Sequence, residues 1–539
     1  MILDSVQKTL AAVAGATAVL LALTACTGGG ASTGGSTPVA GGTLTYASGD
    51  AEPTCLDPHV GGNYPQALLA TQYIEELVGL EDGKPTPELA TQWTTSDDGK
   101  TLTFTLRDDV TFTDGTPFDA AAVVANIEHV QDPATASSTG YLALQSITKA
   151  TATDEHTVTL TLSRPDSALL ESFSQPWVGM ESPKALERDQ ATNCESPVGT
   201  GPFAVTGWKH GDRVTLTKNA DHWGTTKPRL SGITWRFLPD STSRYAALQA
   251  GQVDVIDNAQ PDQLKAASAK GAIRDLDAPR PGASNRLELN SGHGVFRDEA
   301  VRQAFIAGAK IDPGLQSLFL GTAERSYSAL SSAEPLAYSE KSRFTYSPDK
   351  AERLLDEAGW KVGSDGIREK DGQRLTVRFP VSTNQSVPAE RSLFQQIQAS
   401  EQAVGFDVVL DELDLSSWYA ALAANEYDVV SAPYTKVGPD VLRILYDSAS
   451  IEPAPSGYFA NLAQLDDPAL DRLLEQAART SDADERADLY EQAQQLILAS
   501  DTVLPLYDQQ NHFLVRSAVH GIETTPVSTP WFGTAWIDR

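Results

Sequence analysis

The stretch Trp93-Thr-Thr-Ser-Asp-Asp-Gly-Lys-Thr-Leu-Thr-Phe-Thr-Leu106 decides the fold of the first half of this chain. Leu102, Phe104 and Leu106 alternate with threonines, which is the pattern of a strand that buries one face. Asp98-Gly99 is a residue pair that favours the positive φ angles of a tight turn. The stretch therefore predicts a β-hairpin whose apolar face packs against a core.

The segments on either side of this hairpin are also rich in predicted strands. Thr43-Leu-Thr-Tyr-Ala47 predicts an opening strand, and residues 147–162 predict a second antiparallel pair. Between the two pairs, Asp119 can cap a helix. The apolar positions of that helix recur at helical spacing: Val123, Val124, Ile127 and Val130.

The second half of the chain alternates helices with short apolar strands, which favours an α/β fold class. Ser347 is predicted to be the N-cap of a helix with Pro348 at its first position, and Gly359 to end that helix, while Gly405 ends another helix and Asp467-Pro468 begins a third. A fourth helix is predicted around residues 489–497. The predicted strands between these helices are Leu375 to Phe379, Phe406 to Leu410 and Tyr427 to Val430.

Length and charge restrict the class of protein. Residues 41–539 are too many for one hydrophobic core, so at least two domains are expected. The chain has 41 Lys and Arg against 71 Asp and Glu, a formal net charge of −30. Because such a surface repels phosphate backbones, we expect no nucleic-acid partner.

The N-terminus predicts export and lipid attachment. A short apolar segment, Thr9 to Ala25, follows Lys8 and ends in Leu23-Thr-Ala-Cys26. It resembles a bacterial lipoprotein signal, in which the cysteine becomes the lipidated first residue of the mature protein. We therefore expect a signal peptide at residues 1–25, a lipidated Cys26 with a flexible linker at residues 26–40, and a body anchored outside the cytoplasm at the bacterial cell membrane. The alternative is an uncleaved anchor helix.

Two cysteines remain once Cys26 is assigned to lipid. Cys55 and Cys194 form an even pair in an oxidising compartment, so a disulfide between them is expected. The alternative is two separately buried thiols. A metal site is not predicted, because neither cysteine has a partner at ligand spacing.

Catalytic motifs are missing from the sequence. The eight histidines are scattered, and no zinc-protease motif, nucleophile elbow or phosphate-binding loop is present. The Asp-Gly pairs lack the alternating oxygen ligands of a calcium loop and predict turns. We expect neither enzymatic activity nor a cofactor.

Several motifs in register resemble one family, the cluster C extracytoplasmic solute-binding proteins (family 5) of dipeptide, oligopeptide and nickel ABC importers. The match covers residues 41–539 in the family's order. The motifs are Leu56-Asp-Pro-His59, Pro87-Glu-Leu-Ala90 through Phe118, Gly199-Thr-Gly-Pro-Phe203, Asn219-Ala-Asp-His-Trp223, Leu287-Glu-Leu-Asn290, Phe296 to Ala304 and the helix from Ser347 to Trp360.

The resemblance implies a type II periplasmic-binding-protein fold with two lobes around a hinge. A first lobe would span residues 41–285, with an extra subdomain at about residues 80–200, and a second lobe residues 286–509. Residues 510–539 would return to the first lobe. The family implies a monomer that captures a peptide or another polar solute by hinge closure and delivers it to an ABC permease and ATPase complex.

Dipeptide binders of this family hold the peptide's ends with an arginine and an aspartate. In our register Thr383 stands at the arginine's position, and Thr435 or Lys436 at the aspartate's. Burying an unpaired ammonium or carboxylate is costly, so the sequence argues against a small zwitterionic dipeptide and favours a longer peptide or another polar solute. The residues expected to line the cleft are Tyr64, Trp177, Thr383, Asn384, Trp418, Tyr434, Lys436 and Asp440.

Two alternative functions stay open at this point. His59, beside the opening motif, is compatible with a binder of haem or of a metal chelate such as a nickel complex, although a single histidine is more often a hydrogen-bonded loop residue. A peptide sensor that signals without transport is the other alternative.

Overall fold

The computed structural model describes residues 38–81, 83–268, 271–383, 386–431 and 433–538. The predicted signal peptide, Cys26 and most of the predicted linker lie outside these ranges, as does Asn384. In the part of the chain that is described, no helix has both the length and the hydropathy that crossing a bilayer requires.

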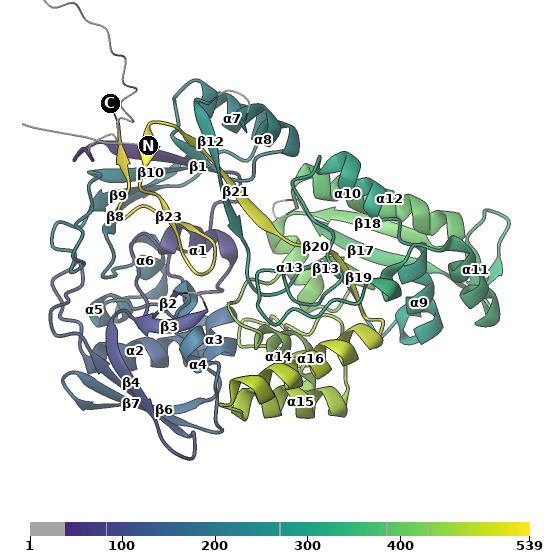
Figure 1. Cartoon of the computed structure of the whole chain (residues 1–539), viewed down its shortest axis with the longest axis horizontal. Helices are drawn as coiled ribbons and strands as arrows, with labels where there is room; N and C mark the ends of the chain where they lie inside the picture. Colours follow the sequence, from purple (N-terminus) through teal and green to yellow (C-terminus); the bar gives the residue numbers. More distant parts are fainter. Residues whose placement is uncertain (1–37, 82, 269–270, 384–385, 432, 539) are drawn as a thin grey trace, which may run out of the picture. The chain divides into compact units, whose positions relative to one another are not determined.

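The predicted first lobe is built on a seven-stranded sheet with the order β12-β21-β11-β1-β10-β9-β8. Its strand β1 is parallel to β10 and β11, and β21 is antiparallel to both β11 and β12. Figure 1 shows β1, β10, β9 and β8 beside one another in this lobe. The strands are β1 (Thr43–Ser48), β8 (Phe203–Lys209), β9 (Arg213–Lys218), β10 (Gly232–Phe237), β11 (Val255–Ile256), β12 (Ile273–Pro279) and β21 (Gln510–Arg516).

A four-stranded sheet, β4-β5-β7-β6, forms the core of the predicted subdomain. It contains the hairpin and the second strand pair that the sequence predicts, as β4 (Ala90–Thr95) with β5 (Thr101–Leu106) and β6 (Ile147–Asp154) with β7 (Thr157–Leu162). Asp119 caps α2 (Ala120–Gln131), accepting from Ala122 N at 2.8 Å. Smaller elements complete this lobe: α1 (Tyr64–Ala70), β2 (Val78–Glu81), β3 (Lys84–Pro87), α3 (Thr139–Leu144), α4 (Leu169–Ser172), α5 (Pro183–Leu186), α6 (Gln190–Glu195), α7 (Ser241–Gln249) and α8 (Pro261–Ser268).

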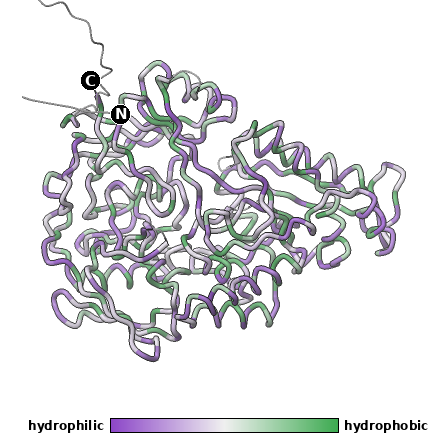
Figure 2. Tube along the Cα trace, in the orientation of Figure 1, coloured by the Kyte–Doolittle hydropathy of each residue, from purple (hydrophilic) through white to green (hydrophobic). Residues whose placement is uncertain are grey.

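The predicted second lobe contains the sheet β19-β13-β20 and the parallel pair β17-β18. Helices cover these strands, and hydrophilic and hydrophobic positions alternate along α15 and α16 in Figure 2. The elements are β13 (Asn285–Leu289), β17 (Thr376–Ser382), β18 (Asp407–Leu413), β19 (Val429–Ser431), β20 (Val503–Tyr507), α9 (Glu299–Gly308), α10 (Asp312–Leu318), α11 (Pro348–Glu357), α12 (Pro388–Val404), α13 (Leu415–Ala423), α14 (Val441–Tyr446), α15 (Pro468–Arg479) and α16 (Ala483–Ala499).

The predicted helix boundaries in this lobe are mostly confirmed. Gly405 ends α12 with a φ of 108°, and the Asp467 side chain accepts from backbone N–H groups at the start of α15. Ser347 differs from the prediction, because its side chain makes no capping hydrogen bond. Its carbonyl oxygen starts α11 instead, accepting from Lys350 N and Ala351 N at 3.0 and 3.1 Å.

The chain passes between the two sets of sheets at two adjacent connections. One joins β12 to β13 through residues 280–284, and the other joins β20 to β21 through residues 508–509. Arg280 N donates to Gln509 O at 3.0 Å, which ties the two connections together. The predicted lobe boundaries at residues 285 and 509 lie close to these connections and stay predictions.

Glu401 in α12 is a buried acid without a stabilising partner. Its side chain is fully buried, and neither carboxylate oxygen has a hydrogen-bond partner among the described residues. Burial raises the pKa of this carboxyl well above 4.5. The folded state therefore binds the Glu401 proton more tightly than the unfolded state does, and stability is lost as pH rises through the folded pKa.

Glu401→Gln will remove this loss of stability with rising pH. Between pH 5 and 8, the wild-type free energy of unfolding will fall more steeply than that of the variant, by up to about 1.4 kcal/mol per pH unit. Urea denaturation at several pH values measures the difference. The exposed Glu352→Gln serves as control, and parallel pH curves for wild type and Glu401→Gln would contradict the interpretation.

Candidate functional site

A cavity of about 320 Å³ lies between residues of the first lobe, the second lobe and the connection between them. Its volume is at the lower end of the range for small-molecule sites. Aromatic side chains and backbone turns dominate its wall. The lining residues are Gly61, Gly62, Asn63, Tyr64, Pro65, Ser138, Thr139, Trp177, Arg280, Trp418, Tyr419, Ala423, Pro433, Tyr434, Thr435, Ser456, Gly457, Tyr458 and Gln509.

The first-lobe wall is the loop that leads into α1. Asn63 and Gln66 form a capping box at the start of this helix, which fixes the position of Tyr64 in its first turn. Trp177 is 3% exposed, and its Nε1 donates to Asn63 O at 3.2 Å. The hydrogen bond holds the indole ring against the glycine turn at Gly62. This wall is therefore a rigid, largely apolar surface.

The second-lobe wall is aromatic as well. Trp418 in α13 is 3% exposed, and its Nε1 donates to Pro380 O at 3.3 Å. Its ring meets Tyr419 edge-on at 5.0 Å between centroids, and Tyr419 meets Tyr458 edge-on at 6.2 Å. Tyr434 follows β19 and is 8% exposed. Such faces can hold apolar or planar parts of a ligand at low entropic cost.

Arg280 contributes a cation to the cavity from the connection after β12. Its guanidinium carbon lies 4.0 Å from the centroid of the Tyr64 ring. Its Nε donates to Thr435 Oγ1 at 2.9 Å, and Nη2 donates to the same oxygen. Arg280 thus contacts both the first-lobe wall and the second-lobe wall.

Several contacts join the two lobes around the cavity. Ser138 Oγ donates to Ser456 Oγ at 2.7 Å at its edge. Farther along the interface, Ser167 N donates to Ala478 O at 2.7 Å. Together with the bond from Arg280 to Thr435, these contacts connect the two walls of the cavity.

The structure places four of the predicted cleft residues in this lining: Tyr64, Trp177, Trp418 and Tyr434. Thr383 is not among the lining residues; it follows β17 and is exposed, with its N–H donating to Leu413 O at 2.8 Å. Asn384 lies outside the described residues.

Lys436 and Asp440 lie in a buried ion cluster and not in the lining. Asp440 accepts two hydrogen bonds from Arg443, from Nε and Nη2, each at 2.8 Å. Lys436 Nζ lies 3.8 Å from Asp440 Oδ2. Burial alone would raise the pKa of Asp440, but the Arg443 guanidinium and the Lys436 ammonium hold it below 3.8. The cluster thus joins the start of α14 to the preceding loop.

Sequence reasoning missed Arg280, Tyr419 and Tyr458 as cavity residues. Tyr419 follows the predicted Trp418 directly, so a helical turn with two adjacent aromatic residues was an available signal. Arg280 stands in Pro279-Arg280-Pro281 at the end of a strand, and Tyr458 in a Pro- and Gly-containing loop, and neither pattern is specific for a binding site.

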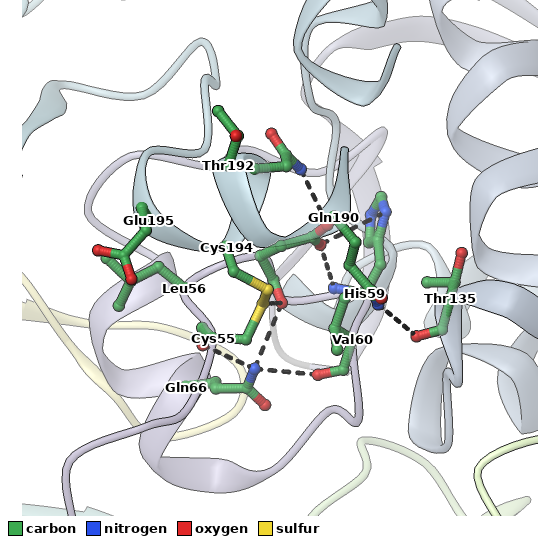
Figure 3. The surroundings of a disulfide bond; sticks show 12 residues. Cys55, Leu56, His59, Val60, Gln66, Thr135, Gln190, Thr192, Cys194 and Glu195 are labelled. Atoms are coloured by element: carbon green, nitrogen blue, oxygen red, sulfur yellow. Dashed lines mark hydrogen bonds and ion pairs between the residues drawn. A yellow bond between two sulfur atoms is a disulfide. The ribbon is translucent and has the colours of Figure 1, made fainter. Parts of the chain in front are cut away.

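The loop before Gly61 is fixed by a disulfide between Cys55 and Cys194. Figure 3 shows Gln66 beside it, where Nε2 donates to Cys55 O at 2.9 Å and to Val60 O at 3.0 Å. His59 is buried, with Nε2 2.8 Å from Gly179 O and Nδ1 3.0 Å from His129 Nδ1. These bonds account for both of its ring nitrogens, and His59 does not line the cavity.

The sequence comparison identifies the family. The model for bacterial extracellular solute-binding proteins, family 5 middle, matches residues 84–451. The chain belongs to family 5 of the bacterial extracellular solute-binding proteins. Two curated Escherichia coli (strain K12) relatives are each 29% identical. One is a glutathione-binding protein aligned over 84% of this chain and 86% of its own length, and the other a nickel-binding periplasmic protein aligned over 81% and 83%.

A solved family 5 type structure shares the fold. The periplasmic binding protein from Helicobacter pylori in complex with the peptide STSA superposes with a TM-score of 0.82 at 24% identity. The superposition covers 93% of this chain and 99% of that one. The predicted two-lobe α/β fold is thereby confirmed, and the names of these relatives describe binding proteins.

Proposed function

We propose that this family 5 protein captures a polar solute or a short peptide in the aromatic cavity and delivers it to an ABC importer; a cavity of about 320 Å³ favours these over the longer peptide that the sequence also allows. The observation that supports this best is a cavity of about 320 Å³ lined from both sides and placed beside two adjacent interlobe connections. Opening at these connections would release the contacts between the lobes, and a ligand that touches both walls would favour the closed state.

The tether is part of the same proposal. A lipid on Cys26 and a linker to residue 40 would keep a monomeric binder near the permease at the outer face of the cell membrane. The binder needs no cofactor. The described lining residues include no histidine, cysteine or carboxylate, so a metal would have to enter as part of a complete chelate.

Removing one aromatic face will weaken binding without unfolding the protein. Trp418→Phe and Tyr458→Ala are each expected to raise the Kd at least tenfold for the solute that co-purifies with the wild type, since both rings lose contact area in the cavity. Native mass spectrometry identifies that solute, and calorimetry measures its Kd. Ligand binding will also reduce the radius of gyration in solution scattering.

Trp208→Phe is the matched control, because Trp208 lies in β8 and does not line the cavity. The proposal fails if no solute co-purifies or binds and the scattering profile never changes. It fails equally if a bound solute has the same Kd in all variants.

A further inference from the structure

We propose that the ligand is a carboxylic acid whose carboxylate pairs with Arg280, and that its binding requires no ammonium group. An N-acylated amino acid or N-acylated short peptide has this chemistry. The inference depends on the proposed function, because it takes the aromatic cavity as the binding site.

The hydrogen bonds of Arg280 leave part of its guanidinium available. A guanidinium carries five N–H groups, and here Nε and Nη2 both donate to the single Thr435 oxygen. Nη1 makes no hydrogen bond to a described residue, and no carboxylate among these residues lies within 4.0 Å of Arg280. Arg280 lines this cavity and also a smaller one of about 120 Å³ that Asp257 and Glu390 line, and its unused donors are available to a carboxylate in the aromatic cavity.

The acids around Arg280 are engaged elsewhere. Asp50 and Glu390 are the carboxylates that act on Arg280; Asp50 accepts from Asn258 Nδ2 at 2.8 Å, and Glu390 accepts from Tyr507 Oη at 3.0 Å. Burial lowers the pKa of Arg280, and burial also raises the pKa of Glu390. Asp50 and Glu390 act on the guanidinium at longer range, and no described carboxylate lies within 4.0 Å of it. A ligand that covers this half-buried cation would remove its remaining water, and a bidentate carboxylate would offset that desolvation cost.

The rest of the cavity offers no anion to the other end of a peptide. None of the described lining residues is an aspartate or a glutamate. A ligand ammonium could lie over the aromatic rings, but a cation–π contact would stabilise it by only about 0.5–2 kcal/mol. Removing the ammonium from water costs more than that. A neutral or acylated amine avoids that cost. The aromatic faces then hold the apolar part of the ligand.

Four matched dipeptide pools test the proposal: free, N-acetylated, C-amidated, and both N-acetylated and C-amidated. Equilibrium dialysis with mass spectrometry will measure what purified wild-type protein retains. We expect the N-acetylated acids to be retained at least tenfold better than their amides, and at least as well as the free dipeptides. Arg280→Gln will abolish the preference for acids, and Arg280→Lys will restore part of it.

Arg353→Gln is the matched control, because Arg353 is exposed on α11 and does not line the cavity. Each variant's fold is checked by its denaturation midpoint. Equal retention of acids and amides overturns the inference, and so does an unchanged preference for acids in Arg280→Gln. In either case, retention of any pool still supports the proposed function. Preferential retention of free dipeptides also overturns it. If no pool is retained, the inference fails, and the co-purification experiment decides whether the proposed function fails with it.

Discussion

Replacing Cys55 and Cys194 together by serine will lower the free energy of unfolding by about 3–5 kcal/mol. The disulfide spans 139 positions of the sequence, and closing a loop of that length removes about 5 kcal/mol of chain entropy from the unfolded state. The bond also holds two segments that interlock: Leu56 N donates to Cys194 O at 2.9 Å, and Asn193 Nδ2 donates to Asp57 Oδ2 at 2.9 Å. These hydrogen bonds remain in the variant, so it should still fold.

Urea denaturation of the oxidised wild type, the reduced wild type and Cys55→Ser/Cys194→Ser will measure the effect. The reduced wild type should unfold at the same concentration as the double variant, and a reducing agent should leave the double variant unchanged. If oxidised wild type and double variant share one midpoint, the bond does not stabilise the folded protein.

Arg443→Met will lower the free energy of unfolding by about 3–5 kcal/mol at neutral pH. The Asp440 and Arg443 side chains are only 1% and 6% exposed, so the variant leaves a buried carboxylate with Lys436 at 3.8 Å as its closest cation. The pair also stabilises the charged form of Arg443. Burial alone would lower the pKa of Arg443, but Asp440 raises it above its usual value. Ligand affinity should not change, because Arg443 does not line the cavity.

The pH dependence provides a second check on this pair. Because the folded pKa of Asp440 lies below 3.8, its contribution to stability is present above that pH and is lost as pH falls through the folded pKa. The difference in the free energy of unfolding between wild type and Arg443→Met should therefore become smaller at acidic pH. Arg479→Met is the control, because it breaks a half-exposed ion pair with Glu475. It should lower the free energy of unfolding by less than about 1 kcal/mol. A comparable loss in both variants would contradict a structural role for the cluster.

Local elements could be predicted from the sequence because their causes are local. Asp98-Gly99 and the alternating threonines define the hairpin within a few residues, and Asp467-Pro468 and Gly405 mark helix ends in the same way. Ser347 is the exception. Its motif predicted where α11 begins but not that its hydroxyl group would make no capping hydrogen bond.

The site could be predicted only in part, because it is assembled from segments far apart in the chain. Large aromatic residues such as Trp177 and Trp418 were recognisable candidates by type alone. Counting from the strand that ends near Val430 predicts Lys436 and Asp440 in the cleft, but the loop that contains them is buried beside α14. Gly438 has a φ of 90° and approaches the Glu171 carboxylate, a contact that no local pattern specifies.

The position of β21 determines when the first lobe can be completed during synthesis. This strand comes from residues 510–516, yet it lies between β11 and β12. Until the ribosome has made that segment, the nascent sheet has a vacant position whose two strand edges are exposed. The lobe therefore cannot finish folding as it emerges. A message truncated before codon 510 would yield an incomplete sheet and not a smaller working protein.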